Sequence, residues 1–84
     1  MDNIFSFLNN QEMNYIFMEI RQLEYFHEIA ATGSIHEAAR RLNMSQPPLS
    51  YQIKQLEAEL NVKLFERTRA GVTLTEAGKL LYER

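Results

Sequence analysis

The chain has 84 residues, of which 45% are hydrophobic and 24% are charged, and it contains no cysteine and no tryptophan. This length accommodates one small domain with its own core, and the lack of cysteine excludes disulfides, thiolate metal sites and thiol nucleophiles. No apolar run approaches the roughly 18 residues that a membrane-spanning helix needs, and the first residues lack the basic region of a secretory signal. We therefore expect a cytoplasmic protein.

The net charge of −2 conceals an uneven distribution along the chain. Residues 1–39 carry one arginine against six carboxylates, a net charge of −5, whereas residues 40–79 carry seven basic against four acidic residues, a net charge of +3. Such a chain can present a basic face to a polyanion while it remains acidic overall. Taken alone, the imbalance is more often that of an ordinary solvated surface.

Residues 1–17 are rich in asparagine and aromatic residues and show no clean period. The favoured interpretation is a loosely held extension, a translation start placed too early or an added leader. The alternative is a helix that docks on the domain or on a second copy.

A helical period begins at Glu19, where apolar residues take the three-to-four spacing of an amphipathic helix. Gly33 supplies a residue that can adopt a positive φ at the end of this helix. Ser34 and Glu37 then form a capping box, so we expect a second helix to begin at once. Residues 43–45 are long enough only for a turn.

A third helix is predicted from Gln46 to Leu60, with its apolar stripe on Leu49, Ile53, Leu56 and Leu60. Ser45 is its N-cap, and the prolines at 47 and 48 delete N–H groups that an N-cap side chain normally satisfies. The Ser45 hydroxyl and the Gln46 amide are therefore free for another partner.

The face opposite this stripe carries small, polar and basic side chains, without a carboxylate in its first two turns. Its residues are Pro47, Ser50, Tyr51, Lys54, Gln55 and Ala58. A helix with this face can offer hydrogen-bonding groups to base edges and positive charge to phosphates in a DNA groove. From the residues alone, an ordinary solvated face is an equal alternative.

After residue 60 the pattern changes to two short strands, over 62–67 and 72–74, around a basic tip at 68–71. Thr75 then opens a last helix as its N-cap. This order of elements predicts a mainly α fold, the winged helix-turn-helix. We expect one core, made of Leu23, Phe26, Ala39, Leu42, Leu49, Ile53, Leu56 and Phe65.

Residues 18–84 resemble the N-terminal DNA-binding domain of LysR-type bacterial transcriptional regulators. The resemblance rests on blocks in the order and spacing of that family, among them Gly33-Ser34-Ile35, Ala38-Ala39-Arg40-Arg41-Leu42, Ser45-Gln46-Pro47-Pro48-Leu49-Ser50, Leu64-Phe65-Glu66-Arg67 and Leu74-Thr75-Glu76-Ala77-Gly78. It implies an extension over 1–17, a winged helix-turn-helix domain over 18–74 and the start of a linker and dimerisation helix over 75–84.

The resemblance implies sequence-specific binding to double-stranded DNA. The residues implied to face bases in the major groove are Gln46, Pro47, Ser50 and Tyr51. Those implied to hold phosphates are Ser45, Lys54 and Arg67, with Arg69 at the wing tip near the minor groove. Two residues depart from the family: Tyr51 stands where arginine is common, and Asn61 stands where glycine is usual, although asparagine tolerates a positive φ.

The resemblance also implies pairing of two protomers through the C-terminal helix. Family members begin near the position of Met18 and continue into an effector-binding α/β domain that these 84 residues do not contain. We therefore expect a fragment, a truncated gene product or a stand-alone remnant, to which no small-molecule regulation is assigned.

Other chemistry is not indicated by the sequence. His27 and His36 lack the spacing of metal ligands, and there is no glycine-rich phosphate loop and no nucleophile elbow. We expect no enzymatic activity, no cofactor, no metal and no membrane partner. Two alternatives to the DNA reader remain: a protein-interaction module on the same fold that heterodimerises with full-length relatives, and a different winged-helix regulator such as the molybdate-responsive kind.

Overall fold

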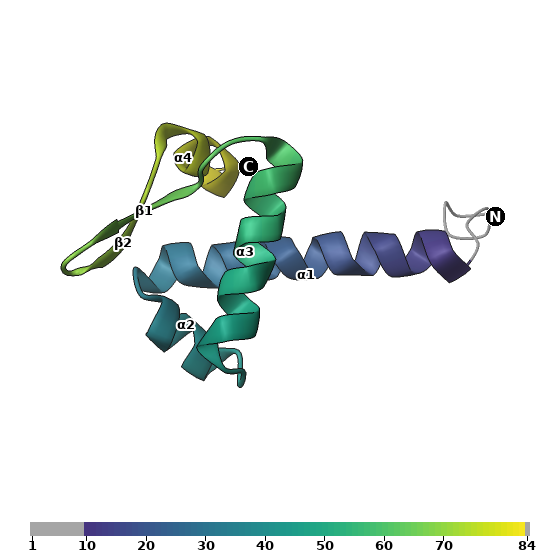
Figure 1. The fold of residues 1–84 in the computed structure, drawn as a ribbon, viewed down its shortest axis with the longest axis horizontal. Helices are drawn as coiled ribbons and strands as arrows, with labels where there is room; N and C mark the ends of the chain where they lie inside the picture. Colours follow the sequence, from purple (N-terminus) through teal and green to yellow (C-terminus); the bar gives the residue numbers. More distant parts are fainter. Residues whose placement is uncertain (1–9, 84) are drawn as a thin grey trace.

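The computed structural model describes residues 10–83, with side chains described from residue 19 onward. The elements in chain order are α1 (Asn10–Thr32), α2 (Ile35–Arg41), α3 (Gln46–Leu60), β1 (Phe65–Thr68), β2 (Gly71–Leu74) and α4 (Glu76–Glu83) (Figure 1). Three helices surround the core, and a two-stranded antiparallel hairpin forms a wing beside them. The predicted winged helix-turn-helix is confirmed.

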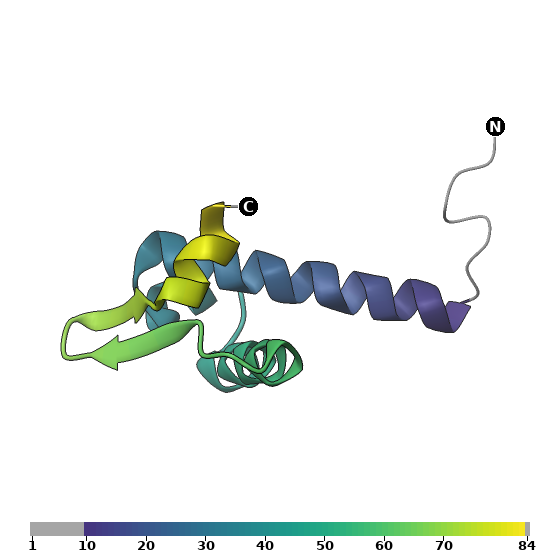
Figure 2. The same cartoon turned by 90° about the horizontal axis from the view of Figure 1, so that it is seen from above.

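The first helix begins at Asn10 rather than at Glu19, so its predicted start was wrong. The prediction followed the apolar period, but residues 10–18 contain no proline or glycine that would stop a helix. Figures 1 and 2 show that the N-terminal turns of α1 extend beyond the other elements. Residues 10–17 of the predicted extension therefore continue α1, and residues 1–9 lie outside the described part of the chain.

The junction between α1 and α2 follows the local signals. Gly33 has φ +68°, and the Ser34 Oγ accepts a hydrogen bond from the Glu37 N–H at 3.1 Å. The reciprocal half of the capping box is absent among the described residues, because the Ser34 N–H donates to the Thr32 Oγ1 at 3.3 Å instead. The Glu37 carboxylate is thereby left for the arginines of α2.

The third helix has the bounds predicted from the sequence. Ser45 precedes it in an extended conformation, and its side chain makes no capping hydrogen bond, as expected from the prolines of the first turn. Asn61 ends the helix in the left-handed region at φ 56°. Asparagine thus fills a position that favours glycine.

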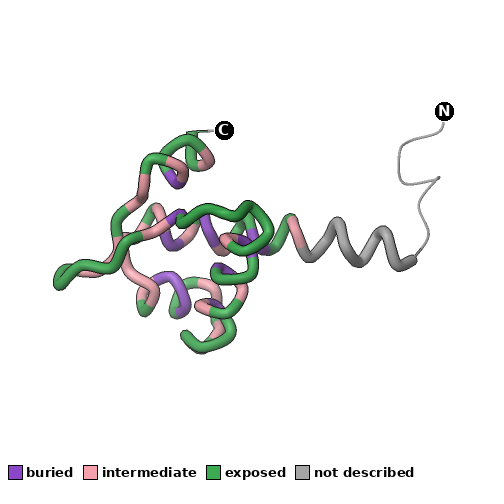
Figure 3. Tube along the Cα trace, turned by 45° about the horizontal axis from the view of Figure 1, so that its top comes forward, coloured by how far each residue is buried: buried purple, intermediate pink, exposed green. Residues whose placement is uncertain are grey.

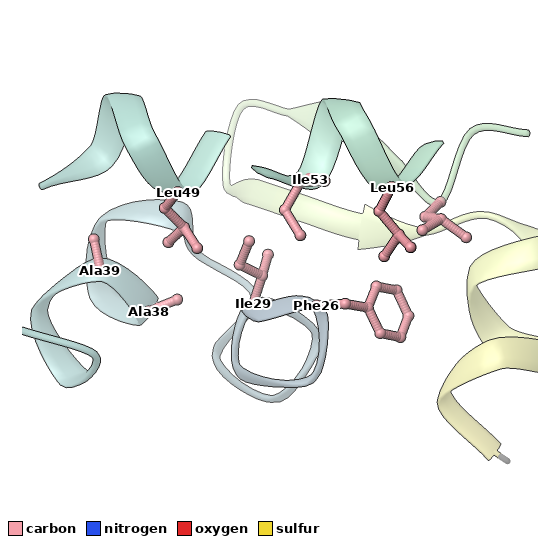
Figure 4. Close-up of a cluster of buried hydrophobic side chains, with 8 residues drawn as sticks. Phe26, Ile29, Ala38, Ala39, Leu49, Ile53 and Leu56 are labelled. Atoms are coloured by element: carbon pink, nitrogen blue, oxygen red, sulfur yellow. The ribbon is translucent and has the colours of Figure 1, made fainter. Parts of the chain in front are cut away.

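The core lies where α1, α2 and α3 meet (Figure 4). Its buried apolar side chains are Phe26, Ile29, Ala38, Ala39, Leu49, Ile53, Leu56 and Leu64. The small side chains of α2 allow a close approach of α3, and Figure 4 shows the Ile29 side chain directed toward α3 between Leu49 and Ile53. Five of the eight predicted core residues are in this cluster.

The other predicted core residues lie at its margin or outside it. Leu42 and Phe65 are half-buried and pack against the cluster, whereas Leu23 is 45% exposed. Leu60, which was placed on the apolar stripe of α3, is 47% exposed in the last turn of that helix.

The inner face of α1 carries Gln22 in place of Leu23. At 100° per residue, Leu23 lies about 90° from the mid-line between Phe26 and Ile29, whereas Gln22 lies about 10° from it. Gln22 is 3% exposed, and its Nε2 donates to the Oε1 of Gln52 on α3 at 3.2 Å. Gln52 of α3 supplies a partner for the Nε2 of this buried amide, whereas its Oε1 has no hydrogen-bond partner among the described residues.

The wing is tied to the helices at both of its ends. Its register pairs Phe65 with Leu74 and Thr68 with Gly71. The first strand begins three residues later and ends one residue later than expected, and the second begins one residue earlier. The Val72 N–H donates to the Gly33 oxygen at 3.0 Å, which joins β2 to the α1–α2 turn. This hydrogen bond holds the hairpin in place in addition to the loops that connect it to α3 and α4.

The last helix is anchored by Thr75, which confirms the predicted cap. The Thr75 Oγ1 accepts from the Gly78 N–H at 3.0 Å and donates to the Lys63 oxygen at 2.6 Å. The Thr75 N–H also donates to the Leu64 oxygen at 3.0 Å. These bonds join the start of α4 to the loop between α3 and β1. Within residues 10–83 no helix is both long and apolar enough to cross a lipid bilayer.

Candidate nucleic-acid interface

The first turn of α3 is short of internal hydrogen bonds. Ser45 and Pro47 are exposed, and the Ser45 hydroxyl caps nothing. Gln46 is exposed as well, but its side-chain amide is not free, because its Nε2 lies 3.0 Å from the Nδ1 of His36 on α2. The predicted free amide was therefore wrong, since the short α2–α3 turn brings the two side chains together.

The outward face of α3 is as polar as the sequence predicts. Tyr51 is 58% exposed, Lys54 is exposed and Ser50 is half-buried. No acidic residue occupies the first turn of the helix. Figure 3 shows the exposed side of α3 and the exposed tip of the hairpin.

A groove of about 670 Å³ lies between α3 and the wing. Three of the predicted contact residues line it together, namely Ser50, Lys54 and Arg67. Arg67 reaches the groove because it pairs across the hairpin with Val72, which also lines the groove, and paired residues share a face of a sheet. The fold thus brings Ser50 and Arg67, which are 17 positions apart in the sequence, to the same groove.

The remaining predicted residues do not line this groove. Ser45, Gln46 and Pro47 lie at the N-terminal end of α3, and Tyr51 lies on its outer face. Arg69 lies in the turn between the strands, at the hairpin tip. The eight predicted residues therefore form three groups: the start and outer face of α3, the groove, and the wing tip.

The cations are divided between paired and unpaired ones. On α2, Arg40 pairs with Glu37, and the Arg41 Nη1 lies 3.6 Å from the Glu28 Oε1. The hydrogen bond from Arg40 lowers the pKa of the Glu37 carboxyl below its usual value, and the charge of Arg41 acts in the same direction. These arginines are thus largely compensated by carboxylates.

In the described part of the chain, the basic residues around the groove make no such ion pairs, although Glu57 and Glu66 line the same groove. Among residues 19–83, no ion pair involves Lys54, Lys63, Arg67 or Arg69. Lys54 on α3 and Arg67 and Arg69 on the wing therefore leave positive charge available to an anionic partner on this side of the molecule, whereas both arginines of α2 are paired.

Three charged residues of the groove were not singled out from the sequence as contacts, namely Glu57, Lys63 and Glu66. Glu57 brings a carboxylate into the groove, where its Oε2 accepts from the Leu64 N–H at 2.7 Å and from the Phe65 N–H at 3.4 Å. It therefore holds the loop that leads into the wing. Lys63 also lines the groove. A basic residue in the loop between the third helix and the hairpin was the sequence signal by which this position could have been predicted.

The described residues hold no cluster of three or more histidine, cysteine, aspartate or glutamate side chains that could bind a metal ion.

The sequence model of the family described as "Bacterial regulatory helix-turn-helix protein, lysR family" matches residues 20–79. The chain belongs to the LysR family. The alternative of a different winged-helix regulator is thereby excluded.

Relatives of the LysR type are similar over the same region. The HTH-type transcriptional regulator TfdT of Cupriavidus pinatubonensis is 53% identical over 66 residues, which are 79% of this chain and 29% of that protein. The HTH-type transcriptional regulator AlsR of Bacillus subtilis is 56% identical over 63 residues, 75% of this chain and 21% of that protein. The chain thus spans less than a third of the length of these curated relatives.

Solved structures of the LysR type share the fold. The DNA-binding domain of CbnR in complex with DNA has a TM-score of 0.72 and 48% identity, covering 75% of this chain and 72% of that one. The DNA-binding domain of BenM in complex with catB site 1 DNA has a TM-score of 0.72 and 41% identity, covering 75% and 71%.

Proposed function

We propose that this chain binds double-stranded DNA sequence-specifically, as the DNA-binding domain of a LysR-type transcriptional regulator. The observation that carries the proposal is that the polar face of α3 lies next to basic residues that make no ion pairs with the described side chains. The outer face of α3 has no carboxylate in its first turn, and Lys54 on that helix and Arg67 and Arg69 on the wing make no ion pair among residues 19–83. The similarity to DNA-binding domains crystallised with DNA supports the same function.

In this proposal the N-terminal half of α3 enters the major groove, which admits one α-helix. The residues that would meet base edges are Gln46, Pro47, Ser50 and Tyr51. Glutamine and serine offer hydrogen-bonding groups, and the exposed ring of Tyr51 offers an apolar surface with a hydroxyl at its end.

The phosphate contacts are assigned to the edges of the same surface. Ser45 precedes the helix with an uncommitted hydroxyl, and Lys54 and Arg67 stand on opposite sides of the groove. Arg69 at the hairpin tip would approach the minor groove. Phosphate contacts of this kind set affinity and register, and they do not carry sequence information directly.

The test is a selection of bound fragments from random duplex DNA with the full chain, followed by two titrations. The enriched duplex and a random duplex are titrated at two salt concentrations, and we expect tighter binding of the enriched duplex at both. Affinity for each duplex should fall with salt, because phosphate binding releases counterions. Equal binding of both duplexes would refute sequence-specific reading, and capture of a full-length relative without any DNA binding would favour the protein-interaction module.

We further propose that two copies pair through α4. Leu80 is 59% exposed and Tyr82 is 39% exposed on this helix. Tyr82 stacks on His27 of α1 at a centroid distance of 5.1 Å, and the exposed Leu23 precedes His27 by one helical turn. An apolar surface that continues from α4 onto α1 supports a second copy as its occupant.

Sedimentation equilibrium tests this pairing. Leu80→Glu should shift the chain toward monomer, whereas Leu60→Glu, which replaces a leucine that is 47% exposed at the end of α3, should not. Equal behaviour of the two variants would remove α4 as the pairing surface.

The proposed function is binding without catalysis. In this proposal the chain acts on DNA in the bacterial cytoplasm.

A further inference from the structure

One histidine outside the proposed DNA contacts bonds to a residue within them. His36 is the second residue of α2, and its Nδ1 lies 3.0 Å from the Nε2 of Gln46, the first residue of α3. Among the described side chains, no other hydrogen bond joins a side chain of α2 to one of α3. Both residues are exposed, so neither is needed to fill the core.

The turn between the two helices fixes the relative place of these residues. Asn43 adopts φ 61°, and the Met44 N–H donates to the Ala39 oxygen at 3.0 Å. The backbone on both sides of the pair is therefore held by hydrogen bonds, and the pair does not depend on a mobile loop.

Nothing in the first turn of α3 competes for the Gln46 amide. Ser45 makes no capping bond, and the prolines at 47 and 48 have no N–H groups to offer. A glutamine side chain on a surface loses considerable rotamer freedom when a ligand orders it. In this chain the Gln46 side chain is hydrogen-bonded to His36 without any ligand.

The atoms of the pair set the direction of the hydrogen bond. An amide nitrogen donates and does not accept, so the Nε2 of Gln46 is the donor and the Nδ1 of His36 is the acceptor. The bond uses one of the two N–H groups of Gln46. The other N–H and the Oε1 remain, and this donor–acceptor pair matches the N7 and the N6 amino group of adenine.

We propose that His36 is a positioning residue for base recognition: its hydrogen bond holds the Gln46 amide with one donor and one acceptor free for an adenine edge of the operator. This inference rests on the proposed function. Prior ordering lowers the entropic cost of the base contact. It also fixes which amide atom faces the base as donor and which as acceptor. A base edge with donor and acceptor exchanged would then place donor against donor and acceptor against acceptor.

The experiment compares the full wild-type chain with His36→Phe, His36→Asn, Gln46→Ala and the double variant His36→Phe/Gln46→Ala. Phenylalanine keeps a ring but removes the acceptor, whereas asparagine places an amide oxygen close to the position of Nδ1. Each protein is titrated with the selected operator and with operators replaced at the one base pair where Gln46→Ala loses its preference.

We expect His36→Phe to lose about 3- to 10-fold of the preference at that base pair, a part of what one bidentate contact supplies. His36→Asn should retain most of the wild-type preference. In the Gln46→Ala background, His36→Phe should cause no further loss, because residues that act through one another are not additive.

Three results would overturn the inference: an unchanged preference in His36→Phe, an equal loss with and without Gln46, or a loss in His36→Asn as large as in His36→Phe. His36→Ala also removes the Nδ1 acceptor but introduces no apolar ring, so it controls for an effect of the phenylalanine side chain itself. A wild-type chain that binds selected and random duplexes alike would instead refute the proposed function, so the two failures are distinguishable.

Discussion

Gly71 of the wing lies directly against the backbone of Gly33 in the α1–α2 turn: a Cβ atom on Gly71 would stand 2.3 Å from the Gly33 oxygen. Both glycines have positive φ, +140° at Gly71 and +68° at Gly33. The neighbouring Val72 N–H bonds to the same oxygen. The position of the wing relative to α3 thus depends on a backbone contact that leaves no room for a side chain.

Gly71→Ala should therefore move the wing and lower the melting temperature. Gly33→Ala is the matched control, because its Cβ would meet only the Val72 oxygen at 3.8 Å. The control should cost about 1–2 kcal/mol for a left-handed alanine, and Gly71→Ala should cost more. Thermal unfolding measures both, and equal losses would show that the contact is not tight.

Leu23→Ala, with Leu56→Ala as the buried reference, distinguishes the observed phase of α1 from the predicted one. Leu56 is 5% exposed and Leu23 is 45% exposed. Removal of a buried leucine costs about 2–5 kcal/mol, whereas a surface change usually costs about 0.5 kcal/mol or less. Chemical denaturation should show a large loss only for Leu56→Ala, and similar losses would contradict the burial of one leucine and the exposure of the other.

Gln46→Ala and Arg67→Ala separate base reading from phosphate binding. A lost base contact costs about 1–3 kcal/mol at one base pair, so Gln46→Ala should narrow the difference between operator and random DNA. Arg67→Ala should weaken both duplexes alike and make the salt dependence shallower by about one unit. Titrations of both duplexes at two salt concentrations give these values, and an equal weakening of both duplexes by Gln46→Ala would exclude it from base reading.

Deletion of residues 1–17 should leave thermal unfolding and DNA affinity nearly unchanged. The first buried side chain described on α1 is Gln22, and the turns that the deletion removes extend beyond the other elements in Figures 1 and 2. Circular dichroism, calorimetry and sedimentation of the shortened chain test this expectation. A loss of dimerisation or of core stability would assign a structural role to this segment.

The Glu37 carboxyl should titrate below its usual range, since the hydrogen bond from Arg40 favours the carboxylate in the folded chain. A lowered folded pKa stabilises the fold above the pKa of the unfolded chain, and this contribution disappears as the pH falls through the folded pKa. In Arg40→Gln an NMR titration should show the pKa of Glu37 moving upward. Arg21→Gln, which changes an arginine on α1 outside these ion pairs, should leave it unchanged.

Local signals in the sequence predicted the elements well. Ser34, Asn61 and Thr75 mark helix ends through their own side chains or their own backbone conformation, and each acts within a few residues. The bounds of α3 were correct for the same reason. The start of α1 was missed because the apolar period was taken for its boundary, although Asn9 with Glu12 three residues later is a sequence signal for a helix start.

The sequence by itself determined the order of the elements, the polar face of α3 and the basic tip of the wing, because these depend on neighbours in the chain. Only the tertiary structure decided which side of α1 is buried, since Gln22 can turn inward only where Gln52 of α3 receives it. It also decided which cations stay unpaired, because Glu28 of α1 reaches Arg41 of α2 while no carboxylate in the described part of the chain pairs with Arg67. The bond between His36 and Gln46 is also a feature that only the tertiary structure decided. Hydrogen bonds between separate helices form where packing brings two side chains together, and the periodicity of the sequence does not predict which side chains meet.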